Sequence, residues 1–81
     1  MNENTTIKLD FPIKIDGKDV SELSVRRPKV RDQLAASKKT NEQKREIFLF
    51  ANLCQLSPDD IQNLDMKDYG KIQKVYVDFL S

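Results

Sequence analysis

The sequence predicts an α+β fold in a single domain, residues 1–81, in which an antiparallel β-hairpin precedes three to four short α-helices. Two observations predict this order. Apolar residues near the N-terminus alternate with polar ones, which is the period of a strand, and later apolar residues recur at three- and four-residue spacing, which is the period of a helix. Strands and helices do not alternate along the chain, so a parallel sheet is not expected.

The hairpin is expected at about residues 5–25. Asp16 and Gly17 lie between two extended runs, which is typical of a type I′ turn. Pro12 cannot donate a backbone hydrogen bond and therefore indicates an edge strand or a break in pairing. In the return strand, the odd spacing from Val20 to Leu23 indicates a bulge or a late start. The first strand places five apolar side chains on one face: Ile7, Leu9, Phe11, Ile13 and Ile15.

The helices are expected at about residues 28–37, 41–55, 58–64 and 66–80. Pro28 suits the first position of the first helix, and Val30 and Leu34 are expected to face inward. The other three helices have capping residues before them. These are Thr40 or Asn41, then Ser57 followed by Pro58, and then Asp65 with Asp68 three residues on.

The second helix is apolar nearly all round, because eight of the ten residues from Ile47 to Leu56 are apolar. A domain of this size can hardly surround such a helix, so we expect it to be shared between the core and an interface. The alternative is that it and the last helix simply fill the core. The last helix has one apolar face, formed by Tyr69, Ile72, Val75, Tyr76, Phe79 and Leu80.

The composition argues against an enzyme. The chain contains no histidine and a single cysteine, Cys54, which lies in an apolar run and is expected in the core. No catalytic, cofactor-binding or metal-binding residue is therefore predicted, and no disulfide within the chain. The acidic pairs Asp59–Asp60 and Asp65–Asp68 are interpreted as charges at helix N-termini. No apolar run could cross a membrane, and the N-terminus lacks the apolar stretch of a signal peptide, so the cytoplasm is expected.

Residues 26–45 form a basic segment between two acidic flanks. They hold eight basic and two acidic residues, whereas residues 1–25 hold three and five, and residues 46–81 hold three and six. One interpretation is a small nucleic-acid-binding regulator. Three features oppose it: no aromatic residues are interleaved, the helix that would enter a groove is the most apolar segment, and the flanks repel phosphate. A solvated basic face and a patch for an acidic or amphipathic protein partner are the other interpretations.

Three segments carry a resemblance to a known family. They are Val25–Asp32, with Arg-Arg-Pro and then Asp, Leu56–Asp68, with Leu-Ser-x-x-x-Ile-x-x-Leu-Asp-x-x-Asp, and Val75–Leu80, which ends in Phe-Leu. In this order and spacing the chain resembles the tail assembly chaperones of Mu-like and P2-like contractile-tailed bacteriophages and prophages. The resemblance extends from about Ile7 to Leu80.

This resemblance implies a noncatalytic chaperone that binds the phage tape measure protein, keeps it soluble in the host bacterial cytoplasm and assists assembly of the tail tube. Such chaperones are absent from the mature virion. Many have a longer form, made by frameshifting, that contacts the tail tube protein, and this chain resembles the short form because it ends at Ser81, after an apolar helix. A minor structural tail protein is a further alternative.

The residues proposed to bind a partner come from the basic segment and from the two apolar helices. A helix of a client could dock on apolar anchors at three- and four-residue spacing. Whether the two arginines instead pair with acids of this chain, such as Asp59 or Asp60, is left open by the sequence. Self-association is also expected, because the core is small and apolar helix surface is plentiful. The proposed partner-binding residues are Arg26, Arg27, Phe48, Leu49, Phe50, Tyr76 and Phe79.

Overall fold

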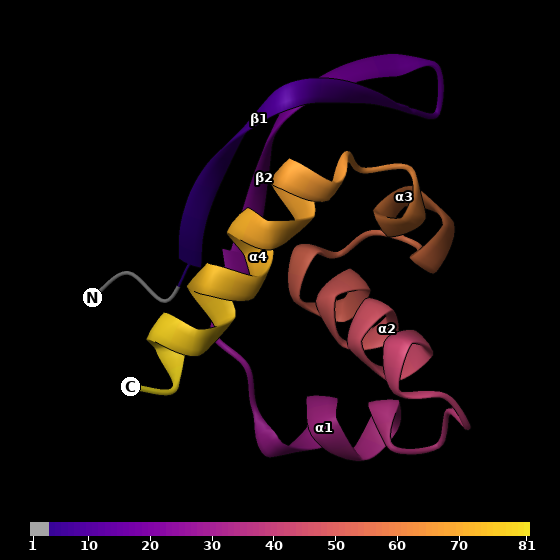
Figure 1. Ribbon diagram of the computed structural model, residues 1–81, viewed down its shortest axis with the longest axis vertical. Coiled ribbons are helices and arrows are strands. Elements are labelled where there is room, and N and C mark those ends of the chain that lie inside the picture. Colours follow the sequence, from indigo (N-terminus) through magenta and orange to yellow (C-terminus); the bar gives the residue numbers. More distant parts are fainter. Residues whose placement is uncertain (1–3) are drawn as a thin grey trace.

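The computed structural model describes residues 4–81 and confirms the α+β class. An antiparallel two-stranded hairpin curves along the helices, with α4 lying along it and α1 at the opposite edge of the molecule (Figure 1). The elements are β1 (Asn4–Ile15), β2 (Lys18–Arg26), α1 (Val30–Ala36), α2 (Glu42–Cys54), α3 (Pro58–Gln62) and α4 (Met66–Phe79).

The turn of the hairpin is the predicted type I′ turn. Asp16 and Gly17 both have positive φ, 52° and 79°, as this turn requires of its two central residues. The pairing on either side of the turn is regular, with Ile15 opposite Lys18 and Ile13 opposite Val20. The Asp-Gly pair therefore sets the register of the strand ends next to it.

An irregularity in the hairpin lies in β1, and not in the return strand as the sequence indicated. Lys8 pairs with Glu22 and Ile13 with Val20, so four residues of β1 lie opposite one residue of β2. Pro12 lies in this stretch and cannot donate to the ladder. The extra residues also change which side chains face inward, because Leu9 is buried whereas Phe11 is 53% exposed. The prediction that Phe11 shares one face with Ile7, Leu9 and Ile13, which are buried, is wrong for this reason.

The helices begin and end close to the predicted residues, and their caps explain why. Asn41 accepts hydrogen bonds from the backbone N–H groups of Gln43 and Lys44 at the start of α2. Ser57 and Asp60 form a reciprocal capping box at the start of α3. The exception is α1, which begins at Val30 because Lys29 is extended, so Pro28 does not occupy the first helical position.

The orientation of α1 is opposite to the prediction. Asp32 and Ala36 are buried, whereas Val30 and Leu34 are 76% and 63% exposed. At about 100° per residue, these two pairs lie on opposite sides of the helix. Because polar contacts hold the Asp32 side chain inside the protein, the side of α1 that carries Asp32 faces the core, and Val30 and Leu34 face the solvent.

The core is one cluster, and α2 lies at its centre. This helix packs against α1, α3 and β2, while α4 packs against β1. Phe50 is 1% exposed, and its ring centroid lies 5.5 Å from that of Tyr69 and 5.7 Å from that of Tyr76, so it joins α2 to α4. Cys54 is also buried, as expected, and burial raises the pKa of its thiol to about 11.

Asp68 joins α4 to the irregular stretch of β1. Its two carboxylate oxygens accept hydrogen bonds from the backbone N–H groups of Asp10 and Phe11, at 2.9 and 3.0 Å. The side chain is fully buried, with the ammonium group of Lys71 at 3.4 Å. The interpretation of Asp68 as a charge at a helix N-terminus therefore missed its main contact, which satisfies N–H groups that the broken ladder leaves without strand partners.

Within residues 4–81, no helix combines the length and the apolar character needed to span a membrane.

Candidate partner-binding surface

Arg26 is bound within its own chain. Its guanidinium group donates to both carboxylate oxygens of Asp32, at 2.6 and 2.9 Å, and Asp32 also accepts from the backbone N–H of Lys29 at 2.8 Å. Asp32 is only 4% exposed. The open question about Arg26 therefore has an answer, since its acidic partner is Asp32 and not Asp59 or Asp60.

This ion pair gives the protein a testable pH dependence. The hydrogen bond from Arg26, opposed by burial and aided by the Lys29 N–H, lowers the pKa of Asp32 in the folded state. The stabilisation is therefore fully present above the unfolded-state pKa of about 3.9 and is lost as the pH falls through the lower folded-state pKa. We expect the free energy of unfolding to fall more between about pH 5 and about pH 2 in the wild type than in Asp32→Asn.

Urea titrations of the two proteins at a series of pH values measure this difference. Asp10 and Asp68 also have lowered pKa values, so Asp32→Asn should keep part of the acid sensitivity. Parallel profiles for the two proteins would contradict the role given to Asp32.

The side chain of Arg27 contacts a different element, the C-terminal end of α4. Its guanidinium carbon lies 5.7 Å from the ring centroid of Phe79, in a cation–π arrangement. Arg27 is exposed and Phe79 is half-buried. The structure thus brings together two of the proposed partner-binding residues that are 52 positions apart in the sequence.

The proposed apolar residues of the two long helices divide between core and surface. Leu49 and Phe50 are buried, so neither side chain is available to a partner in this fold. Tyr76 is half-buried against Phe50. Phe48 is half-buried at the surface, where the ammonium group of Lys39 lies 4.6 Å from its ring centroid.

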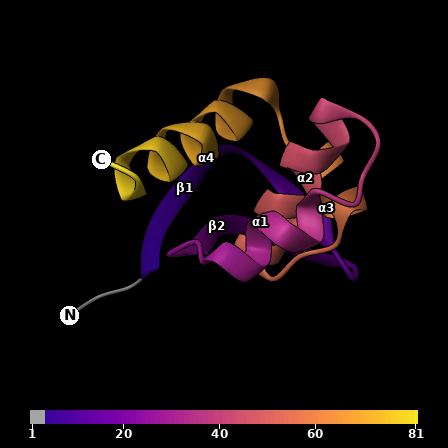
Figure 2. The same ribbon diagram turned by 90° about the horizontal axis from the view of Figure 1, so that it is seen from below.

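The most exposed pair of apolar side chains on a helix face was not among the predicted partner-binding residues. Val30 and Leu34 lie one turn apart on the outer side of α1, which forms the lower edge of the molecule in Figure 1 and lies at the front in Figure 2. The sequence did contain a signal for this arrangement. Asp32 and Ala36 share the opposite side, and Asp32 lies within reach of Arg26 across the turn.

A basic hollow of about 420 Å³ adjoins α1 where β2 ends. Arg27, Lys29 and Arg31 are exposed around it, and none of the three forms an ion pair with a carboxylate within the part of the chain that the structure describes. The hollow is therefore suited to a negatively charged group of a partner. Its lining residues are Asn4, Arg26, Arg27, Pro28, Lys29 and Arg31.

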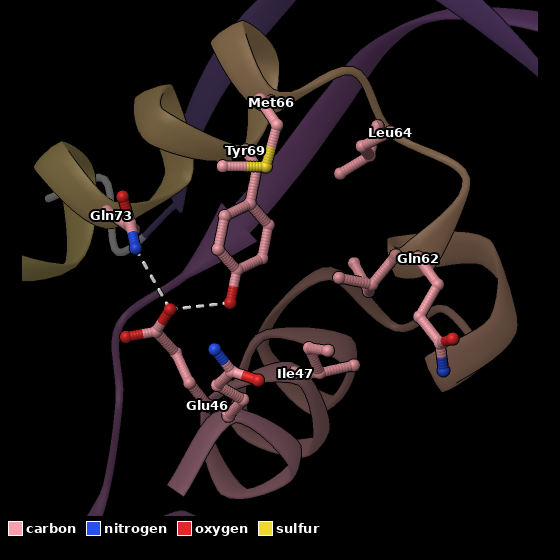
Figure 3. Close-up of a pocket in the computed structure, with 9 residues that line it drawn as sticks. Glu46, Ile47, Gln62, Leu64, Met66, Tyr69 and Gln73 are labelled. Atoms are coloured by element: carbon pink, nitrogen blue, oxygen red, sulfur yellow. Dashed lines mark hydrogen bonds between the residues drawn. The ribbon is translucent and has the colours of Figure 1, made fainter.

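A second hollow, a groove of about 510 Å³, lies between α2, α3 and α4 (Figure 3). At its side, the hydroxyl of Tyr69 and the amide of Gln73 both donate to the carboxylate of Glu46, at 2.5 and 2.9 Å. Burial and the neighbouring Glu46 raise the pKa of Tyr69, so this phenol stays protonated as a donor. The network joins α2 to α4 and leaves the groove with mostly apolar and amide side chains.

Within the part of the chain that the structure describes, neither hollow offers a set of metal-binding side chains. Among residues 4–81, no three His, Cys, Asp or Glu side chains are grouped so that they could hold a metal ion. The arrangement is suited instead to binding, through exposed apolar side chains on α1 and cations beside them.

Comparison with known proteins gives a family match. The family model described as "Phage tail assembly chaperone proteins, E, or 41 or 14" matches residues 6–81, which is nearly the whole chain. Neither the curated proteins nor the solved structures gave a match.

Proposed function

Since the chain belongs to the phage tail assembly chaperone family, we propose that it acts in tail assembly by binding the tape measure protein and keeping it soluble. The action is noncatalytic and takes place in the host cytoplasm. The chaperone assists assembly of the tail tube around its client and then leaves, so it is absent from the mature virion.

One observation supports binding in particular: large apolar side chains are exposed on the outer sides of two helices. Val30 and Leu34 project from α1, and Val77 and Leu80 from the end of α4, each at least 59% exposed. An aggregation-prone client with amphipathic helices offers apolar surface that such side chains can cover. Exposed side chains at a spacing of three or four residues match the anchors of one face of a client helix.

Co-expression with the tape measure protein of the same genome tests the proposal. We expect the soluble fraction of the tape measure protein to rise, and the two proteins to co-purify through a tag on either one. A long helical protein unrelated to tails is the control, and its solubility should not change. If the tape measure protein stays insoluble and does not co-purify, binding of this client is disproved.

The basic hollow supports a second candidate, a nucleic-acid-binding regulator that uses the segment 26–45. Three cations of this segment are already engaged by side chains of the chain itself, because Arg26 pairs with Asp32, Arg27 lies over Phe79 and Lys39 lies over Phe48. Duplex DNA binding that weakens steeply with salt is what this candidate requires. For a minor structural tail protein, the third candidate, mass spectrometry of purified particles should detect the chain.

Two further parts of the proposal concern assembly. Self-association would cover part of the exposed apolar surface, and light scattering on the purified protein measures it. A longer form made by frameshifting would add a contact with the tail tube protein, and mass spectrometry of infected or induced cells would detect such a form.

A further inference from the structure

We propose that α1 and the basic hollow beside it form one docking face for an acidic amphipathic helix of the tape measure protein. This α1 docking face consists of Val30, Leu34, Arg27, Lys29 and Arg31. The inference rests on the proposed function, and it adds which surface binds the client and what chemistry the bound segment has.

The apolar part of the α1 docking face is the pair Val30 and Leu34. They are four residues apart, 76% and 63% exposed, and lie on one side of the helix. Ridges with this spacing are the ones that helices use to pack against each other. An apolar stripe on a client helix could therefore lie across α1 and remove both side chains from water.

The opposite side of α1 holds the docking face in place. The guanidinium group of Arg26 donates to both carboxylate oxygens of Asp32, and the Lys29 N–H donates to the same carboxylate. Ala36, on the same side of the helix, is buried in the core. The short helix is thus fixed before a partner arrives. A preformed binding surface loses less conformational entropy on association than a mobile one.

The charges identify the kind of helix that fits. Arg27, Lys29 and Arg31 surround the hollow next to Val30, and no described carboxylate pairs with any of them. Acidic residues beside the apolar stripe of a client helix would meet these cations. Nucleic acid fits less well, because a phosphate backbone would leave the central Val30 and Leu34 without an apolar partner.

The apolar half of the proposal is tested with Leu34→Asp and with the matched control Met66→Asp. Both residues are exposed and neither supports the core, so both variants should unfold at the urea concentration of the wild type. Leu34→Asp should weaken capture of the tape measure protein by about tenfold or more, since a charge replaces an apolar anchor. Met66→Asp, at the first residue of α4 and outside the α1 docking face, should leave capture unchanged.

The charged half is tested with Lys29→Glu/Arg31→Glu and with the control Lys14→Glu/Lys18→Glu at the hairpin turn, which makes the same change of charge. The first double variant should capture the client several-fold more weakly, and the deficit should shrink at high salt because added ions screen exposed charges. The control double variant should behave like the wild type.

Each failure has its own pattern. If the wild type does not capture the tape measure protein at all, the proposed function fails and this inference with it. If the wild type captures it and both α1 variants equal their controls, this inference alone is overturned. It is also overturned if Leu34→Asp changes only the oligomeric state, which would assign the face to a second copy, or if the charge variants lose only binding to a duplex DNA probe.

Discussion

Replacing Asp68 by Ala is expected to destabilise the protein by about 3 kcal/mol, measured as the free energy of unfolding in urea. The carboxylate is fully buried and accepts hydrogen bonds from two backbone N–H groups of β1, those of Asp10 and Phe11. Without it, each N–H group loses its acceptor, at about 1–3 kcal/mol for a buried group. The lower half of this range applies, because the backbone there lies near the surface.

This loss is large for so small a domain, whose total stability is about 4–12 kcal/mol at typical values per residue. The loss is large because of where Asp68 lies in the fold, and not only because it accepts two backbone hydrogen bonds. Asp68 joins the first turn of α4 to the stretch where β1 leaves the ladder, so its removal releases two elements that are far apart in the sequence. We therefore expect the loss of stability to be accompanied by weaker hydrogen-exchange protection in Leu9–Ile13.

Two variants control this measurement. Asp68→Asn keeps the size of the side chain but offers one oxygen to two donors, so it should be nearly as damaging as Asp68→Ala. Asp78→Asn makes the same chemical change on the exposed side of the same helix and should stay within about 0.5 kcal/mol of the wild type. Wild-type stability in both Asp68 variants would mean that the contact with β1 contributes nothing.

The order of elements follows from local signals that act over a few residues. Asp16-Gly17 is enough to specify a type I′ turn, and Asn41, Ser57 and Asp65 each satisfy N–H groups of the helix that follows. These interactions depend on residues within three positions of each other, so the sequence reveals them. That is why the predicted fold class and most of the helix starts agree with the structure.

The orientation of α1 depends instead on a contact that hydrophobic patterning cannot reveal. Patterning places Val30 and Leu34 inside, because apolar residues are usually buried. A bidentate ion pair with Arg26 outweighs that preference and turns Asp32 inward. The candidate site changes as a result, since Leu49 and Phe50 belong to the core and Val30 and Leu34 are exposed.

The motifs that carry the family resemblance turn out to be mainly structural. Arg26 and Asp32 of the first segment pair with each other, and Ser57, Ile61 and Asp68 of the second form a cap, a core contact and the contact with β1. Residues with these roles maintain a fold whatever its partner. Of the side chains we propose for the α1 docking face, Arg27 belongs to the Arg-Arg-Pro motif, whereas the exposed apolar pair Val30 and Leu34 is not specified by any of the motifs.

Replacing Arg26 by Ala is the second change with a large expected effect, a loss of about 3 kcal/mol in the free energy of unfolding. The reason is the carboxylate left behind. Asp32 is 4% exposed, and removal of its bidentate partner leaves a buried charge with only the Lys29 N–H as a described donor. Arg27→Ala is the matched control. It removes only the cation–π contact with Phe79, which at an exposed site is worth about 0.5–1 kcal/mol.

The comparison of these adjacent arginines separates a structural role from a binding role. Arg26→Ala should lower stability, and Arg26→Ala/Asp32→Ala should lower it by less than the sum of the two single changes, since the second replacement removes the unpaired charge. Arg27→Ala should keep nearly full stability yet capture the tape measure protein less well. If Arg26→Ala were as stable as the wild type and lost only client capture, Arg26 would be a partner contact, and the ion pair could not be what turns α1.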